Sequence, residues 1–162
     1  VETLTTDKAV KLFEKFGIFT KAELESREEV LYEIYAKTIN IEALTMIDMA
    51  SKEIIPAVIK YSKSLADSVL AVKEAGADAE VQTELLKEVS AKLTEMKTAL
   101  AKLEEVEAKA AAMENAKDQA FYYKDVVKAA MDALRKPADE LEMIVDKKVW
   151  PFPTYADLMF EV

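Results

Sequence analysis

The sequence predicts an all-α fold of long antiparallel helices packed into a helical bundle, followed by a proline- and aromatic-rich C-terminal tail. Only two Gly and four Pro occur in 162 residues, so turns must be few and helices long. Apolar residues recur every three or four positions over most of the chain, which is the helical repeat. Because 51% of the residues are hydrophobic, the chain can bury a core, and we expect a single helical domain over residues 1–162.

A short first helix is expected over residues 7–16. Thr6 can cap this helix because its hydroxyl accepts a hydrogen bond from an otherwise unpaired backbone N–H. Gly17 suits the left-handed residue that ends a helix. The next helix would then begin at the motif TKAE, in which Thr20 and Glu23 form a capping box.

The second helix is predicted to be long, over about residues 21–75, because no convincing stop signal occurs before Gly76. A break or kink is considered near Asn40, where KTINIE is rich in β-branched residues. Pro56 is expected to kink the helix because it removes one hydrogen bond. Its main apolar stripe is predicted to begin with Leu31, Ile34 and Tyr35.

Other apolar residues of this second helix, such as Ile59 and Leu70, lie off the main stripe. The helix is therefore expected to be apolar on more than one side, as a central helix would be.

Two further helices are predicted, over about residues 79–116 and 118–148. Gly76 and Asp78 mark the turn that precedes them, as helix terminator and helix cap. Pro137 lies within the last helix and leaves two alternatives. It is either a kinked continuation or the first residue of a new helix, where proline is well tolerated.

Composition excludes several classes of function. The chain has 22 Lys and Arg against 31 Asp and Glu, a net charge of -9, without a basic block that could bind nucleic acid. It has no Cys and no His, which removes disulfides, thiolate sites, Ser-His-Asp triads and histidine-ligated zinc or di-iron centres. No apolar run approaches a membrane-spanning length. A reducing cytoplasm is compatible with this composition.

Acidic pairs such as Glu28–Glu29 and Glu104–Glu105 are frequent but lie on predicted exposed faces. Acid–base catalysis needs carboxylates in a pocket that separates their pKa values. Two isolated Gly cannot form a phosphate-binding loop. We therefore assign no catalytic, cofactor-binding or metal-ligating residue. Because the sequence begins with Val1 rather than Met, we interpret it as a processed product or a piece of a longer chain.

The C-terminal tail, residues 149–162 with the sequence VWPFPTYADLMFEV, resembles the C-terminus of type III glutamine synthetases, the large bacterial form. Residues 16–61 resemble the helical segment that follows the catalytic region of these enzymes, and residues 121–143 resemble their last long helix. The most specific stretches are INIEALTMIDMA, LRKPADELE and WPFPTY. The resemblance covers almost the whole chain.

The resemblance implies a parent enzyme of glutamine biosynthesis in bacterial nitrogen metabolism, a glutamate–ammonia ligase that uses ATP and a divalent metal, Mg²⁺ or Mn²⁺. Its ligands would lie in a β-grasp domain and a catalytic barrel that do not match these residues. The resemblance thus implies a catalytically silent C-terminal region without cofactors of its own. It also implies a cytoplasmic homo-oligomer, in which the partners are the rest of the parent enzyme and neighbouring subunits, with no nucleic acid or membrane.

A structural or assembly role is therefore expected, in which the tail supplies docking anchors after Pro151 and Pro153 stop the last helix. We expect the tail to fold back on the helices and to bury Trp150. The five candidate anchors are Trp150, Phe152, Tyr155, Leu158 and Phe160. The alternative function is a free-standing helical protein–protein interaction module that grips a partner helix in a groove. The reading frame upstream of Val1 would discriminate between the two.

Overall fold

The computed structural model describes residues 1–153 and 155–160, and the side chains of all of these except Tyr155 and Ala156. No strand occurs among these residues, so the all-α prediction is confirmed. Two of the helical elements are π-helical turns, η1 and η2. The elements are α1 (Asp7–Lys15), α2 (Lys21–Met49), η1 (Ala50–Ile54), α3 (Ile55–Glu74), α4 (Glu80–Ala111), α5 (Ala116–Tyr122), η2 (Tyr123–Val127), α6 (Lys128–Glu142) and α7 (Tyr155–Phe160).

The chain forms two compact units. The first unit comprises residues 1–44 and 106–129, and the second comprises residues 45–105 and 130–162. The chain passes between the units within α2, α4 and α6. Compactness alone does not define a domain, so a single helical domain over residues 1–162 stays a prediction.

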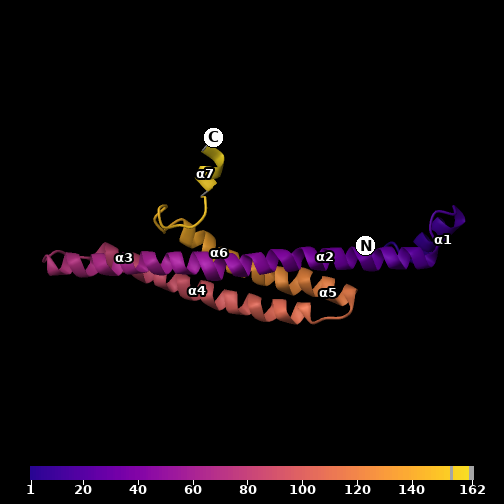
Figure 1. Ribbon diagram of the computed structural model, residues 1–162, viewed down its shortest axis with the longest axis horizontal. Coiled ribbons are helices and arrows are strands. Elements are labelled where there is room, and N and C mark those ends of the chain that lie inside the picture. Colours follow the sequence, from indigo (N-terminus) through magenta and orange to yellow (C-terminus); the bar gives the residue numbers. More distant parts are fainter. Residues whose placement is uncertain (154, 161–162) are drawn as a thin grey trace. The chain divides into compact units, whose positions relative to one another are not determined.

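The first unit packs the N-terminal part of α2 against the end of α4 and against α5 and η2. Asn40 on α2 donates hydrogen bonds to Glu107 on α4 and to Tyr123 on η2. Gln119 on α5 donates to the backbone carbonyl of Ala110 on α4 at 3.0 Å. Within this unit α4 runs antiparallel to α2 and to α5 (Figure 1). The buried apolar residues of the first unit are Val10, Leu24, Tyr32, Ala36, Ile39, Ala43, Val106, Ala110, Ala120, Tyr123 and Val127.

The local signals at the start of the chain are confirmed. Thr6 caps α1, with its hydroxyl accepting from the Ala9 N–H at 3.4 Å. Gly17 adopts φ 63, the left-handed conformation that glycine tolerates best. The backbone N–H of Thr20 donates to Glu23 Oε2 at 2.7 Å, and the Glu23 N–H donates to Thr20 Oγ1 at 3.3 Å. These two bonds are the reciprocal pair of a capping box.

The break considered near Asn40 is absent, and α2 continues to Met49. An Asn disrupts a helix when its side chain competes for nearby backbone groups, whereas this side chain donates to two other elements instead. The irregularity lies further along, at η1, where the Ile55 N–H donates to the Ala50 carbonyl five residues back. This wider turn comes directly before Pro56, which then stands in the first turn of α3. A proline is tolerated there because an N–H at that position needs no partner within the helix.

The second unit contains α3, most of α4, the main part of α6 and the tail. The predicted turn after α3 is confirmed, because Gly76 has φ 79 between α3 and α4. Lys92 on α4 and Glu140 on α6 form an ion pair with 2.6 Å between Nζ and Oε2. The buried apolar residues of this unit are Ala50, Ile54, Ala57, Val58, Ala79, Val89, Met96, Leu100, Leu103, Met131, Leu134, Leu141, Val145 and Trp150.

The helix expected over residues 79–116 ends earlier, at Ala111. The reason is the cap of the next helix, where Asn115 Oδ1 accepts from the Asp118 N–H at 3.0 Å. The helix expected over residues 118–148 ends at Glu142.

Two features shape this last helix and its end. Pro137 lies inside α6, so the continuation was the correct alternative. After α6, Asp146 organises a turn, because its side chain accepts from the Lys148 N–H and its carbonyl accepts from the Trp150 N–H.

Candidate functional site

The tail folds back within the second unit and buries Trp150, as predicted. Only 9% of Trp150 is exposed. A pocket of about 260 Å³ lies beside it, lined by the end of α2, η1, α6 and the tail itself. The lining residues are Met49, Ile54, Ala138, Asp139, Glu142, Trp150, Phe152, Pro153 and Leu158. This arrangement attaches the tail to its own helices through the indole.

Three of the other candidate anchors do not share this burial. Phe152 is half-buried, whereas Leu158 and Phe160 are 70% and 77% exposed. The side chain of Tyr155 lies outside the described residues. An ion pair between Lys147 and Asp157 joins α7 to the turn before the tail. Leu158 and Phe160 are therefore not anchors within the described chain, and a docking role of the five residues stays a prediction.

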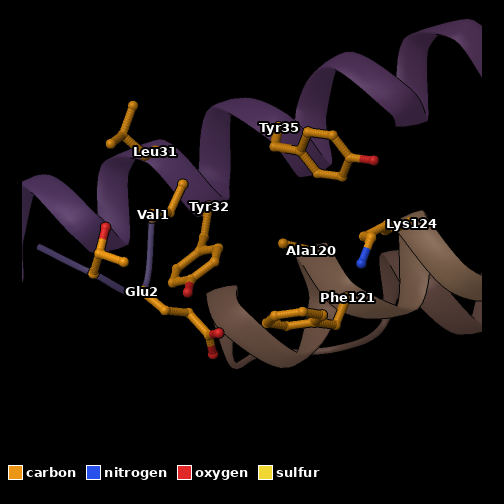
Figure 2. Close-up of a pocket in the computed structure, with 9 residues that line it drawn as sticks. Val1, Glu2, Leu31, Tyr32, Tyr35, Ala120, Phe121 and Lys124 are labelled. Carbon is orange, nitrogen blue, oxygen red and sulfur yellow. The ribbon is translucent and has the colours of Figure 1, made fainter.

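A second pocket, here called the N-terminal pocket, lies in the first unit and has a volume of about 350 Å³. Figure 2 shows Val1 and Glu2 at one end of this pocket, α2 side chains above it, and Phe121 and Lys124 from α5 and η2 opposite. Its lining residues are Val1, Glu2, Thr3, Leu31, Tyr32, Tyr35, Ala120, Phe121 and Lys124.

Aromatic and ionic contacts fix the walls of the N-terminal pocket. The rings of Tyr32 and Phe121 lie 6.1 Å apart at 45°, a tilted arrangement that aromatic pairs favour. Lys124 Nζ lies 5.6 Å from the centre of the Phe121 ring, a cation–π contact. Glu2 pairs with Lys117 at 2.9 Å, which ties the N-terminal segment to α5.

The electrostatics of this pocket favour docking over catalysis. Burial, followed by the hydrogen bond to Glu28, raises the pKa of Tyr32, so its hydroxyl stays protonated at neutral pH. The hydrogen bond to Lys117 lowers the pKa of Glu2, and the same bond raises the pKa of Lys117. Glu2 is thus held in an ion pair, Lys124 lies over the Phe121 ring, and most of the remaining wall is apolar or aromatic. An apolar side chain of a partner segment fits such a cavity better than a reacting substrate.

The described part of the chain contains no group of three or more Asp or Glu placed to hold a metal ion. No helix within residues 1–153 and 155–160 is both long enough and apolar enough to cross a membrane. Assigning no catalytic, cofactor-binding or metal-ligating residue to this chain stays a prediction.

The residues at the predicted start of the apolar stripe on α2 are not buried within the described chain. Leu31 and Ile34 are exposed, and Tyr35 lies at the limit of exposure. The face that packs inward is instead formed by Leu24, Tyr32, Ala36, Ile39 and Ala43. The alanines at helical spacing were the signal for the inward face, because they let neighbouring helices approach closely.

The three consecutive aromatic residues of FYYKD lie on different surfaces. Phe121 lines the N-terminal pocket, Tyr122 is half-buried and Tyr123 is only 1% exposed. Sequence reasoning missed the N-terminal pocket itself, although these aromatics indicated that α5 faces more than one neighbour.

Comparison with known proteins shows what the chain is similar to. Residues 1–73 match the model of the family described as Glutamine synthetase C-terminal domain. A glutamine synthetase of Butyrivibrio fibrisolvens is 38% identical over 159 residues, which cover 97% of this chain and 23% of that protein. A glutamine synthetase of Bacteroides fragilis (strain YCH46) is 32% identical over 149 residues, 88% of this chain and 20% of that protein.

A third relative is the Type-3 glutamine synthetase of Dictyostelium discoideum. It is 31% identical over 163 residues, which cover 97% of this chain and 22% of that protein. The chain spans between 20% and 23% of the length of these three relatives. The family model and the three alignments agree: residues 1–73 are similar to glutamine synthetase C-terminal domains, and nearly the whole chain is similar to a part of glutamine synthetases.

Proposed function

We propose that this chain is the structural and assembly region at the C-terminus of a type III glutamine synthetase. The parent enzyme would make glutamine from glutamate and ammonia with ATP, through phosphorylation of the glutamate side chain. It would act in the cytoplasm as a homo-oligomer and serve bacterial nitrogen metabolism. The partners of this region would be the rest of the parent enzyme and its neighbouring subunits.

The observation that carries this proposal is an exposed apolar face on α2, formed by Val30, Ile34, Ile41 and Leu44 and here called the outer face. These four side chains are between 47% and 65% exposed. Soluble proteins rarely leave a continuous apolar stripe of this kind uncovered. A region that packs against the rest of an enzyme needs such a face, whereas catalysis does not.

ATP and a divalent metal, Mg²⁺ or Mn²⁺, would be held by other parts of the parent. The carboxylates described here do not fit a metal site, because no three of them are grouped for ligation. We therefore assign this region no step of the reaction. Its net charge of -9 also favours protein partners over nucleic acid.

Two experiments test the proposal. The first assays the isolated 162-residue chain for ATP-dependent formation of glutamine, and the expected result is no turnover. Measurable turnover would show that the chain is catalytic. The second deletes these residues from the parent enzyme and measures subunit assembly, thermal stability and glutamine formation. We expect assembly or stability to fall, and the structural role is wrong if all three stay unchanged.

A further inference from the structure

We infer that the outer face of α2 is the surface on which the polypeptide that precedes Val1 in the parent enzyme docks, within the same chain. This inference rests on the proposed function and names its docking surface. The geometry of the face, its polar neighbours, the length of the relatives, the position of Val1 and the charge of the chain all support it.

The outer face forms one continuous strip along α2. At about 100° per residue, Val30, Ile34, Ile41 and Leu44 fall within an arc of about 80° and span about 21 Å along the axis. The inward face lies on the opposite side, where Leu24, Ala36 and Ala43 are at most 1% exposed. The helix is thus apolar on two opposed sides, and the described chain covers only one of them.

The polar groups on and beside the outer face already have partners. Lys37 lies between Ile34 and Ile41, and its Nζ pairs with Glu33 Oε2 at 2.7 Å. The aliphatic stem of such a lysine can extend the apolar strip. Thr38 donates its hydroxyl to the Ile34 carbonyl at 2.9 Å. A partner can therefore cover the strip without leaving these groups buried and unpaired, which would be costly.

The length of the relatives indicates what could cover the outer face. The chain spans only 20% to 23% of them, so a parent of this kind has several times more polypeptide with which this region must pack. The family model that matches residues 1–73 is described as a C-terminal domain, which implies that most of this polypeptide precedes Val1.

The position of Val1 brings that polypeptide to α2. Val1 lines the N-terminal pocket together with Leu31 and Tyr35 of α2, the helix that also carries the outer face (Figure 2). The pairing of Glu2 with Lys117 at 2.9 Å holds the segment there. A tethered segment reaches millimolar effective concentrations near its attachment point. The preceding polypeptide thus meets the outer face before any partner that must diffuse to it.

Charge argues against a second copy of this region as the occupant. Each copy carries a net charge of -9, and like charges of this size repel at close approach. The outer face itself presents an internally paired lysine and glutamate rather than a pattern that would attract the acidic surface of another copy. The polypeptide that precedes Val1 in the same chain is therefore a better occupant of the outer face than a second copy of this region.

Thiol labelling of the full-length parent enzyme tests whether the face is covered. An Ile34→Cys variant is compared with Val81→Cys, a matched variant at the start of α4, where the native side chain is 74% exposed. A water-soluble maleimide is used, and the labelled peptides are quantified by mass spectrometry against denatured samples. We expect labelling at position 34 to be slower than at position 81 by at least about tenfold, because a covered site reacts only through opening. Equal rates would overturn the inference.

Photocrosslinking identifies the occupant. A benzophenone amino acid is placed at position 41 of the full-length parent, and the products are separated by mass and mapped. Crosslinks within one chain to peptides that precede Val1 support the inference. A crosslinked dimer, or a crosslink to residues 1–162 of another copy, overturns it.

Glutamine formation is measured on the same preparations. An assembled parent that makes no glutamine contradicts the proposed function. An active parent in which position 34 labels as fast as position 81 contradicts only the docking surface.

Discussion

The side-chain amide of Asn40 donates a hydrogen bond to the hydroxyl of Tyr123 at 2.9 Å, from the middle of α2 to the first residue of η2. The same amide group donates to Glu107 Oε1 on α4 at 2.7 Å. Because Tyr123 is only 1% exposed, this bond is made in a setting where an unpaired polar group would be costly. One side chain therefore fixes how three elements of the first unit align.

Replacing Tyr123 by Phe should lower the free energy of unfolding by about 1 kcal/mol, because a buried hydrogen bond is lost while the ring remains. Urea denaturation followed by circular dichroism measures the change. The matched control is Tyr122→Phe, since the neighbouring hydroxyl makes no hydrogen bond among the described residues. Similar losses in both variants would show that the bond to Asn40 contributes nothing specific.

The same tyrosine should make stability sensitive to alkaline pH. Burial raises the pKa of Tyr123, the hydrogen bond from Asn40 offsets part of this rise, and the charge of Glu107 adds to it. The unfolded chain then loses this proton first, at a pH of about 10. Stability should therefore fall as the pH rises through and beyond that value. Urea midpoints measured between about pH 9 and 11 should decline less steeply in Tyr123→Phe than in the native chain.

The capping box at the start of α2 should make stability sensitive to acid. The backbone hydrogen bond from Thr20, followed by its hydroxyl, holds the pKa of Glu23 below its ordinary value of 4.5. The unfolded chain therefore takes up this proton first as the pH falls. The contribution is present above about pH 4.5 and is lost as the pH falls through the folded-state pKa.

Thermal unfolding at pH 7 and at about pH 3 measures this contribution, because the two values lie on either side of the ordinary carboxylate pKa. Glu23→Gln should lower the melting temperature at pH 7 and should lower it less at about pH 3. The control is Glu29→Gln, which removes an exposed carboxylate from the same helix. An equal effect of the two variants at both pH values would contradict an acid-sensitive cap.

Local signals in the sequence were sufficient for the caps and for α4. The hydroxyl of Thr6, the left-handed Gly17 and the pairing of Thr20 with Glu23 depend on neighbours within a few residues. Apolar residues recur every three or four positions along α4, and this spacing alone indicates its inward face. Leu86 and Leu93 are half-buried, and the buried residues are Val89, Met96, Leu100, Leu103, Val106 and Ala110.

Features that depend on distant residues could not be predicted in this way. Because α2 is apolar on two sides, its sequence does not say which side its own chain covers, and the side with Leu31 and Ile34 is the exposed one. Asn40 was suspected of breaking the helix. The local sequence could not show its partner, because Tyr123 lies 83 residues further along. The early end of α6 arises from the turn around Asp146, which competes with a helix that the apolar period alone would extend.

The tail provides the last prediction, because it contains one buried and one exposed aromatic residue close together. Trp150 is 9% exposed and Phe160 is 77% exposed. Trp150→Ala should lower the free energy of unfolding by about 3 kcal/mol, since it removes a large buried ring and leaves a cavity. Phe160→Ala should change it by less than about 0.5 kcal/mol, as expected for an exposed side chain. Urea denaturation of both variants measures the difference.

Fluorescence of the native chain provides an independent measurement, because Trp150 is its only tryptophan. The indole should emit as a buried group, resist quenching by acrylamide, and shift to the emission of exposed tryptophan only in the main unfolding transition. Phe160→Ala should leave this signal unchanged. Emission typical of exposed tryptophan in the native chain, together with equal effects of the two substitutions, would mean that the tail does not dock through Trp150. The aromatic residues of the tail would then act only in contact with the rest of the parent enzyme.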